Sequence, residues 1–427
     1  MFVFLAIIGL SVLVFFHELG HFLMAKILGI RVEEFGFGYP PRICGFVWLR
    51  RSKLSSFLKN HFAAISCFFI KNGFLKRHLA FNRVKFFWGK NIPSQAEKKT
   101  IYSLNWIPFG GFNKLKGELD GLEDKDSFFS QTWWKKALVG LGGVAMNITL
   151  AIFIFSFLYS TGISQDIDFI EENSRVLRPI GIQVSMVAPN SPADRQGLKM
   201  GDIIISIDGY SFKQVQEIQD YIKTKINQSL TIQIRRDKEI IARQVEVLPY
   251  NQVFTESVNQ LLDEQEQNKI NNPADETHGV IGVALSRAAI VVYPWHQAIL
   301  MGFKATASLI SQLFYGLWLI FKTFLLKRQM LGEFLGPVGI TAMTAQVAHL
   351  GYVYFLQFIA FLSVAIGAFQ IIPFPALDGS RVLFAIIQGI KGKPISHRIE
   401  NTIISLGFYL LLGLLFFITF KEISGLF

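Results

Sequence analysis

The stretch Phe15-Phe16-His17-Glu18-Leu19-Gly20-His21-Phe22 lies inside an apolar segment near the start of the chain. On a helix, residues four apart share one face, so the imidazoles of His17 and His21 are expected about one turn apart. Two such nitrogens suit two corners of a tetrahedral zinc site, and Glu18 beside them is placed to act as a general base on water. Three ionisable side chains in a membrane-length apolar helix are costly, which favours a functional role over a solvated helix face.

The composition is that of a membrane protein. Hydrophobic residues make up 51 % of the 427 residues, Phe alone accounts for 42 of them, and the net charge is +11. We interpret the positive charge as cytoplasmic loops under the positive-inside rule rather than as a nucleic-acid site, because no nucleic-acid-binding motif accompanies it. Because the first charged residue after Met1 is Glu18, the first segment lacks the basic start of a signal peptide and is expected to stay as a transmembrane helix.

Apolar segments of spanning length predict a polytopic α-helical membrane protein. Residues 42–99 carry many Lys and Arg but a single acid, Glu97, so this loop is expected to be cytoplasmic. The expected parts are a first transmembrane helix in 1–30, a membrane-associated β-hairpin with the basic insertion in 31–135, a second transmembrane helix in 136–160, an extracytoplasmic region in 161–290, an interfacial or re-entrant helix and the Gly-Pro-Val-Gly-Ile turn in 291–350, a transmembrane helix ending in Leu-Asp-Gly in 351–380, and a cytoplasmic connection with the last transmembrane helix in 381–427.

Two further residues at membrane depth draw attention. Asn147 lies in the Gly-rich second span, where small residues permit close approach of helices. Its amide either makes an interhelical hydrogen bond or serves the site, and both interpretations stay open. Gln370 lies near the end of the 352–372 span, and its amide is either tied to neighbouring backbone or placed near the metal.

A catalytic zinc needs three protein ligands and one open position. Pro373 and Pro375 must break the 352–372 helix, which leaves Asp378 at the membrane border on backbone expected to be non-helical and covered by protein or water. The connection after this span is also basic, with Arg381, Lys391, Lys393 and Arg398. If this connection and the 42–99 loop are both cytoplasmic, the first span and the 352–372 span run in the same direction, and His21 and Asp378 lie at similar depth. Asp378 is therefore the best third ligand.

The extracytoplasmic region contains an ordered set of strand and turn signals. Ile180-Gly181-Ile182 opens a strand, Gly-rich turns follow in 197–209, and a helix begins at Val215. This order resembles a PDZ domain of the bacterial protease type over about 178–250. PDZ domains capture extended peptides by strand addition, and Ile180, Gly181 and Ile182 are the expected peptide-binding loop. The alternative is a packing module or steric filter that binds no peptide.

The motifs His-Glu-Leu-Gly-His, Phe-Gly-Phe-Gly, Ile-Pro-Phe-Gly-Gly-Phe, the Gly-rich span, the PDZ-like region, Gly-Pro-Val-Gly-Ile and Pro-Phe-Pro-Ala-Leu-Asp-Gly occur in that order. The chain resembles the bacterial site-2 proteases, intramembrane zinc metalloproteases of regulated intramembrane proteolysis. The resemblance implies one Zn²⁺ per chain on His17, His21 and Asp378, with Glu18 as the catalytic base. It also implies substrate-binding or transition-state support by Gln370, which stands where the family usually has Asn. Asn147 is a candidate for the same role.

The same resemblance implies partners and a location. Substrates would be single-span membrane proteins, such as anti-sigma factors already trimmed by an upstream site-1-type protease, or remnant signal peptides. The protein would be a multi-pass protein of the bacterial inner membrane, in contact with the lipid bilayer, with an extracytoplasmic PDZ domain and an active site near the cytoplasmic side. The two hairpin strands would lie near the site, and residues 44–98 look like an insertion between them.

Two alternatives come from other functional classes. A catalytically inactive PDZ scaffold would bind zinc without cleaving any membrane protein, and the intact motif with a placed third ligand argues against it. A zinc transporter would need a polar path across several helices, whereas the second and last spans contain few carboxylates or histidines. Zinc flux into liposomes would favour the transporter.

Overall fold

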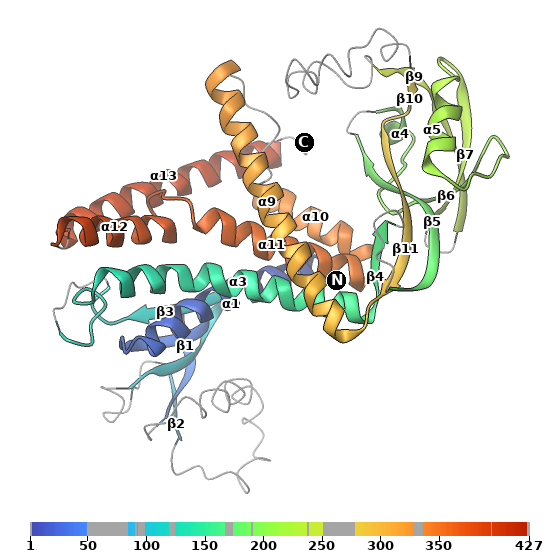
Figure 1. Ribbon diagram of the computed structural model, residues 1–427. Helices are drawn as coiled ribbons and strands as arrows, with labels where there is room; N and C mark the ends of the chain where they lie inside the picture. The colour runs from blue at the N-terminus through green and yellow to red at the C-terminus, as the bar shows by residue number, and fades with distance from the viewer. Residues whose placement is uncertain are drawn as a thin grey trace, which may run out of the picture. The chain divides into compact units, whose positions relative to one another are not determined.

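The computed structural model describes residues 2–48, 84–89, 92, 99–118, 124–166, 174–188, 191–236, 239–250, 278–327, 336–393 and 395–424. The chain forms two compact units (Figure 1). The first unit comprises residues 1–154, 305–313 and 334–427, and the second comprises residues 155–304 and 314–333. Most of the expected 44–98 insertion lies outside the described residues.

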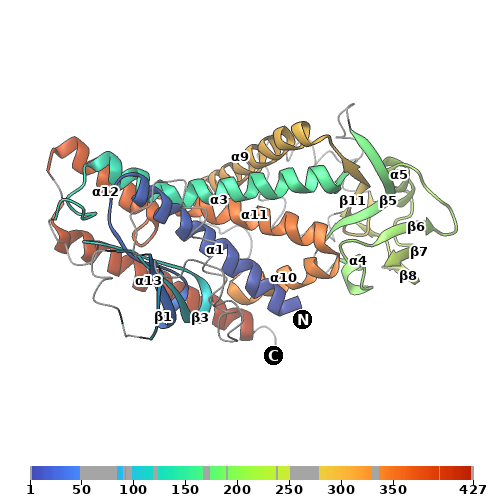
Figure 2. The same cartoon turned by 90° about the horizontal axis from the view of Figure 1, so that it is seen from below.

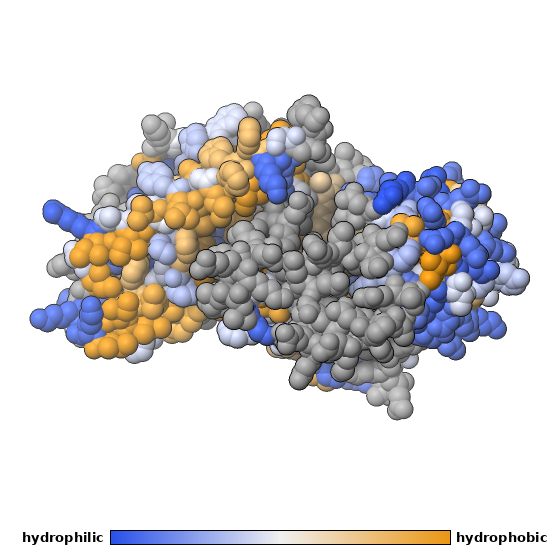
Figure 3. All heavy atoms as spheres, turned by 90° about the horizontal axis from the view of Figure 1, so that it is seen from above, coloured by the Kyte–Doolittle hydropathy of each residue, from blue (hydrophilic) through white to orange (hydrophobic). Residues whose placement is uncertain are grey.

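Long apolar helices form most of the first unit. The described part of the chain contains five helices that are long and apolar enough to cross a membrane, and they coincide with the apolar segments expected from the sequence. On the face drawn in Figure 3, hydrophobic side chains gather over the long helices, while the strand-rich part of the second unit is mainly hydrophilic. The helices longer than ten residues are α1 (Phe2–Ile27), α3 (Trp133–Thr161), α9 (Trp295–Lys327), α10 (Pro337–His349), α11 (Tyr352–Gln370), α12 (Asp378–Lys391) and α13 (His397–Ser424).

Glycines let α1 and α3 approach closely. A Cβ built at Gly20 would lie 2.1 Å from the carbonyl oxygen of Gly142, so neither position has room for a side chain. On α11, Ser363 Oγ donates to the carbonyl oxygen of Asn147 on α3 at 2.8 Å. Helix α3 therefore contacts both α1 and α11, as Figure 2 lets the reader follow.

A three-stranded sheet of order β2-β1-β3 completes the first unit. Strand β1 (Val32–Trp48) pairs antiparallel with β3 (Ile101–Leu115) and with the short edge strand β2 (Val84–Trp88). Phe35 of β1 pairs with both Tyr102, near the start of β3, and Asn113, near its end. The two strands are therefore bent and do not form a simple hairpin. The ion pair between Arg42 and Glu34, with Nε at 2.9 Å from Oε1, links the first part of β1 to its middle.

The sheet packs directly on α1. A Cβ at Gly110 would lie 2.5 Å from a methyl group of Val14, and one at Gly111 would lie 2.8 Å from Cβ of Glu18. Next to this contact, the rings of Phe22 and Phe35 stack with centroids 4.5 Å apart. Both rings are buried, and burying a Phe contributes on the order of 1.5–3 kcal/mol. Aromatic packing thus holds the Phe-Gly-Phe-Gly segment of β1 against α1, and the two glycines bring the Ile-Pro-Phe-Gly-Gly-Phe segment of β3 close to the same helix.

The second unit is built on a six-stranded sheet of order β4-β11-β5-β6-β7-β8. Ile218 and Ile222 of helix α5 pack into the apolar core of this sheet. Asp202 is almost fully buried and accepts two hydrogen bonds from the guanidinium of Arg236, at 2.7 and 2.8 Å. The elements are β4 (Ile163–Asp166), β5 (Arg175–Val187), α4 (Pro192–Arg195), β6 (Ile203–Ile207), α5 (Val215–Lys223), β7 (Ser229–Arg236), β8 (Glu239–Glu246), β9 (Leu248–Pro249), β10 (Gly279–Val280) and β11 (Val283–Val292).

Two helices were not expected from the sequence. Helix α10 begins inside the Gly-Pro-Val-Gly-Ile motif, because Pro337 takes the first helical position, where its missing N–H costs nothing. Helix α12 begins at Asp378, which corrects the expectation that Asp378 stands on non-helical backbone. Leu377 is extended and starts the new helix, and Gly379 lets it pack against the end of α11, since a Cβ there would lie 2.3 Å from the carbonyl oxygen of Ile371.

Candidate active site

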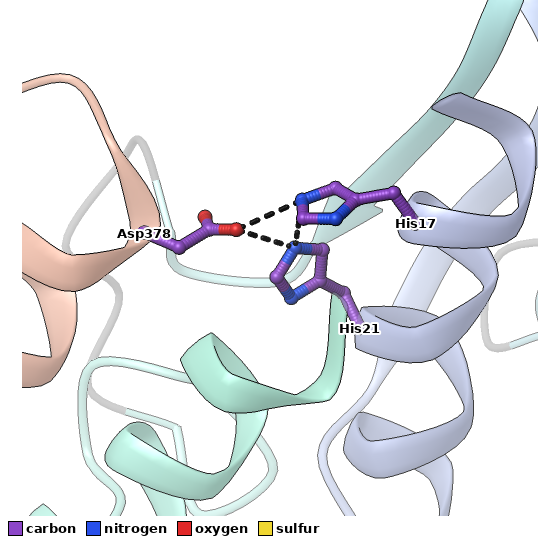
Figure 4. Close-up of side chains that lie close together, drawn as sticks. All are labelled: His17, His21 and Asp378. Atoms are coloured by element: carbon purple, nitrogen blue, oxygen red, sulfur yellow. Dashed lines mark hydrogen bonds and ion pairs between the residues drawn. The ribbon is translucent and has the colours of Figure 1, made fainter. Parts of the chain in front are cut away.

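Three side chains from two distant parts of the chain converge in the first unit (Figure 4). His17 Nε2 lies 2.9 Å from Asp378 Oδ2, His21 Nε2 lies 3.0 Å from the same oxygen, and the two Nε2 atoms are 3.2 Å apart. Both histidines are buried. The structure thus brings together the three metal ligands expected from the sequence.

The hydrogen bonding of His21 explains why this cluster fits a cation. His21 Nδ1 is 2.8 Å from the carbonyl oxygen of Val139, which only an Nδ1–H can approach favourably. In the neutral tautomer Nε2 is then a bare acceptor that faces a carboxylate oxygen and a second imidazole nitrogen. Acceptors that converge in this way are stabilised by a shared cation. Zinc bonds of about 2.0–2.2 Å at tetrahedral angles separate ligand atoms by about 3.4 Å, so the donor set and its spacing fit Zn²⁺.

The loop before α12 delivers Asp378 to the histidines. Helix α11 ends at Gln370, and Pro373 and Pro375 prevent its continuation. Ala376 adopts a φ of 80°, a left-handed conformation rare for a residue with a Cβ, and it reverses the chain just before Asp378. A tight, proline-defined turn therefore fixes where the third ligand stands.

Asn147 contacts the far side of the His17 ring. Its amide lies 3.3 Å from His17 Nδ1, the side chain is fully buried, and Oδ1 has no partner among the described residues. When His17 binds a metal through Nε2, Nδ1 carries the proton and needs an acceptor. A 180° rotation of the Asn147 amide would place Oδ1 next to that proton, which pairs both the Nδ1–H of His17 and the Oδ1 of Asn147. This geometry favours a positioning role for Asn147 over direct support of the substrate.

Gln370 contacts the backbone of the third ligand. Its Oε1 accepts a hydrogen bond from the backbone N–H of Asp378 at 3.4 Å. That N–H is in the first turn of α12 and has no partner within the helix. The contact matches the interpretation in which the amide is tied to neighbouring backbone, and it makes Gln370 a positioning residue for Asp378.

Glu18 faces a polar cavity beside the cluster. The cavity has a volume of about 180 Å³, and His21 and Asp378 also line it. The Glu18 carboxylate can therefore reach a water molecule in the cavity next to the three proposed ligands. A general base in hydrolysis must lie within such reach of the attacking water. The remaining lining residues are Asn113, Leu115, Glu118, Phe128, Val139, Gly140, Ala376, Leu377, Ser380, Arg381 and Ile404.

The sequence interpretation missed an ion pair at this cavity. Arg381 Nη1 pairs with Glu118 Oε1, which joins α12 to the end of the β-hairpin. The Glu118 carboxylate raises the pKa of the Arg381 guanidinium above its ordinary value, so Arg381 stays charged. Arg381 is three residues after Asp378 and so shares its helix face, a spacing signal that points to the site once α12 is known. No pattern in the sequence identifies Glu118 as its partner.

In the second unit, the expected peptide-binding loop is part of a strand inside the sheet. Strand β5, which holds Ile180, Gly181 and Ile182, lies between β11 and β6, and Ile182 pairs with Arg287 on one side and Ile204 on the other. Among the described residues, β6 pairs with β5 at Ile182 and Gln183, so both edges of the strand are occupied there, and Ile182, which lies in the core, is closed to a further strand. A groove of about 360 Å³ instead runs along Ile222 and Lys223 of α5 and residues 278–283.

Comparison with known proteins agrees with this site. Residues 5–58 and 75–414 match peptidase family M50. The chain belongs to peptidase family M50, the site-2 protease family. It is 30% identical over 423 residues to "Putative zinc metalloprotease CPE1693" of Clostridium perfringens, covering 99% of this chain and 98% of that protein. It is 27% identical over 456 residues to "Zinc metalloprotease RasP" of Oceanobacillus iheyensis, covering 99% and 98%.

The M50 membership makes the chain a zinc metalloprotease, and with its span-length helices a multi-pass membrane protein. Among solved structures, the chain is similar to a PDZ domain of an SdrC-like protein from Listeria monocytogenes, and the alignment covers 25% of this chain and 86% of that domain. The sequence identity is 24% and the TM-score 0.18. The M50 match also spans the β-hairpin and both helices that carry the ligands.

Proposed function

We propose that this M50 protease cleaves peptide bonds inside membrane-embedded segments of single-span membrane proteins. The observation that carries the proposal is the convergence of His17, His21 and Asp378 beside the Glu18 cavity, with α1 and α11 both of membrane-spanning length. A hydrolytic centre held between such helices is accessible to membrane segments and shielded from bulk protein. The site is proposed to hold one Zn²⁺ per chain.

The chemistry assigns a separate role to each side chain. His17, His21 and Asp378 would hold zinc, which supplies a Lewis acid that polarises the scissile carbonyl and acidifies water. Glu18 accepts a proton from the attacking water and passes it to the leaving amine. Val139 holds His21 in its ligand tautomer, while Asn147 and Gln370 keep His17 and Asp378 in place.

The site also supports a membrane topology. His21 is near the C-terminal end of α1, and Asp378 follows the C-terminal end of α11, so both helices are proposed to run from outside to inside. Helix α3 then returns outward, the second unit is extracytoplasmic, and α9 stays on the outer face without crossing. The active site would lie near the cytoplasmic side of the bacterial inner membrane.

Substrate choice is proposed to depend on the second unit and on earlier processing. We assign the unit to the PDZ type, with the groove beside α5 as the place where an extended peptide would dock. Substrates would be anti-sigma-factor-like proteins trimmed by an upstream site-1-type protease, or remnant signal peptides. A helical substrate hides its carbonyls, so it must unwind before cleavage. The strand at Gly111, which contacts Glu18, is where the unwound segment would lie.

The proposal is tested on purified protein loaded with zinc. Glu18→Gln should retain zinc and lose cleavage of a single-span transmembrane substrate, because an amide cannot accept the proton of water. Asp378→Ala should lose zinc and cleavage together. Glu18→Gln should also trap substrates for mass spectrometry. Normal cleavage by Glu18→Gln, or wild-type protein without bound zinc, would contradict the proposed chemistry.

A further inference from the structure

Asn113 carries a polar atom that the fold leaves unsatisfied. Its Oδ1 is buried and has no hydrogen-bond partner among the described residues. Other residues, such as Ser103 and Asn105, also have a buried oxygen in this condition, but Asn113 alone among them lines the cavity beside Glu18 and Asp378. A buried acceptor without a partner costs about 1–3 kcal/mol. The Asn113 side chain is part of the cavity wall, and a 180° rotation of the carboxamide exchanges its oxygen and nitrogen, so either polar atom can meet a partner that enters the cavity.

The strand directs Asn113 toward the reacting groups. Successive side chains of a strand point to opposite faces, so residues 111, 113 and 115 share one face of β3. Gly111 on that face lies against Glu18, and Asn113 and Leu115 both line the cavity. Lys114, on the other face, pairs with Glu33 at 2.9 Å.

The other polar groups of the cavity wall already have roles. Glu118 and Arg381 are paired with each other, and Ser380 Oγ donates to the carbonyl oxygen of Leu377 at 2.7 Å. His21 and Asp378 belong to the ligand cluster, and Glu18 is the proposed base. Asn113 is thus the one lining side chain in the described part of the chain that offers a neutral amide with an unused acceptor.

The chemistry of a membrane segment indicates what this amide would meet. The side chains of such a segment are mainly apolar, so its polar groups are the main-chain N–H and C=O groups. Once the segment unwinds in a site of low dielectric, these groups must be paired again. A carboxamide is suited to this, because its oxygen accepts from a peptide N–H and its nitrogen donates to a peptide carbonyl.

We propose that Asn113 binds the main chain of the substrate next to the scissile bond, as a specificity-determining residue that selects unwound peptide. This role rests on the proposed intramembrane cleavage. It is separate from the positioning roles of Asn147 and Gln370, because Asn113 touches no metal ligand and faces the cavity instead.

The test combines a variant with single backbone changes in a substrate. The probe is a synthetic 30-residue single-span peptide in micelles, with one amide at a time replaced by an ester, which removes one N–H. Asn113→Leu, which has the same shape, should lower kcat/KM about 10-fold or more, the usual consequence of an unpaired buried polar group. One ester position should lower the rate of cleavage by the wild-type protein to a similar degree. The same ester should not lower the rate of Asn113→Leu any further, because the two changes remove the same contact. Lys114→Gln is the matched control and should respond to every ester as wild type does.

A second measurement does not depend on turnover. A fluorescent tripeptide hydroxamate should bind wild-type holoenzyme and Lys114→Gln equally, and Asn113→Leu about 10-fold more weakly at unchanged zinc content. Asn113→Asp keeps the acceptor oxygen and should keep the ester response. Equal hydroxamate affinity in all variants, or additive ester effects at every position, would overturn the role of Asn113. A wild-type protein that holds no zinc would instead refute the proposed function.

Discussion

Gly143 on α3 stands directly against His21 on α1. A Cβ built at Gly143 would lie 2.5 Å from His21 Nε2, closer than any carbon atom can approach. The same Cβ would lie 2.5 Å from Cε1 of His17, so α3 forms a wall against both ligand imidazoles. The glycine run in the second span therefore serves the metal site as well as the close approach of two helices.

The first prediction concerns this wall. Ala is about 1 kcal/mol better than Gly in a helix interior, so Gly143→Ala would stabilise an isolated helix. Here the methyl group displaces both imidazoles, and we expect Gly143→Ala to lose most bound zinc and all detectable cleavage. Gly413→Ala on α13 is the matched control, because a Cβ there meets nothing within 4 Å, and it should keep both. If Gly143→Ala retained zinc, α3 would have to move away from the two imidazoles to make room for the methyl group, and the prediction would be wrong.

A second prediction concerns the pair Arg381 and Glu118. It is partly buried, and removal of one partner leaves the other charge uncompensated beside the cavity. Arg381→Ala and Glu118→Ala should each lower the thermal midpoint and loosen zinc, because α12 carries Asp378. The double charge swap, Glu118→Arg with Arg381→Glu, should recover part of both losses. No recovery in the swap would mean that the two side chains act independently.

A third prediction concerns Glu422 on α13. Its Oε1 accepts from the backbone N–H groups of Gly336 and Gly339, at 2.6 and 3.1 Å, and so caps the start of α10. Loss of a helix cap typically costs about 0.5–2 kcal/mol, so Glu422→Ala should lower the unfolding free energy by that amount. Glu422→Gln keeps an acceptor and should be milder. Equal stability of both variants and wild type in a thermal melt would exclude a capping role.

The convergence of His17, His21 and Asp378 follows from the sequence more directly than their surroundings do. His17 and His21 are four residues apart on one helix, a local pattern, and Pro373 and Pro375 made Asp378 stand out among the acids. Helix α12 was missed, because a helix that begins right after two prolines depends on the close packing of Gly379 against α11. The groove beside α5 in the second unit was not predicted, for a similar reason. Strand order, which alone separates an inner strand from an open edge, comes from pairings distant in sequence.

The fourth prediction concerns topology. Because α1 and α11 both end at the site, they should run in the same direction, which leaves α3 as the one crossing between them and α9 on the outer face. In a chain without Cys44 and Cys67, single cysteines at Met200 and Glu333 should react with a membrane-impermeant maleimide added to intact cells. A cysteine at Lys391 should react only after permeabilisation. Labelling of position 333 from the cytoplasmic side alone would mean that α9 crosses.

The last prediction separates two roles for Gln370. As a positioning residue it holds the backbone N–H of Asp378, and loss of such an outer contact typically lowers metal affinity or activity about 10–100-fold. Gln370→Ala should then bind zinc more weakly and regain most of its cleavage rate when the site is saturated, while Gln370→Glu, which keeps the acceptor, should resemble wild type. As a donor to the transition state it would instead leave zinc affinity unchanged and lower kcat by about 100-fold even at saturation. Because the structure shows the carbonyl oxygen of Gln370 in use as an acceptor toward Asp378, we expect the first outcome. Titration of zinc against cleavage rate for the three proteins distinguishes the two.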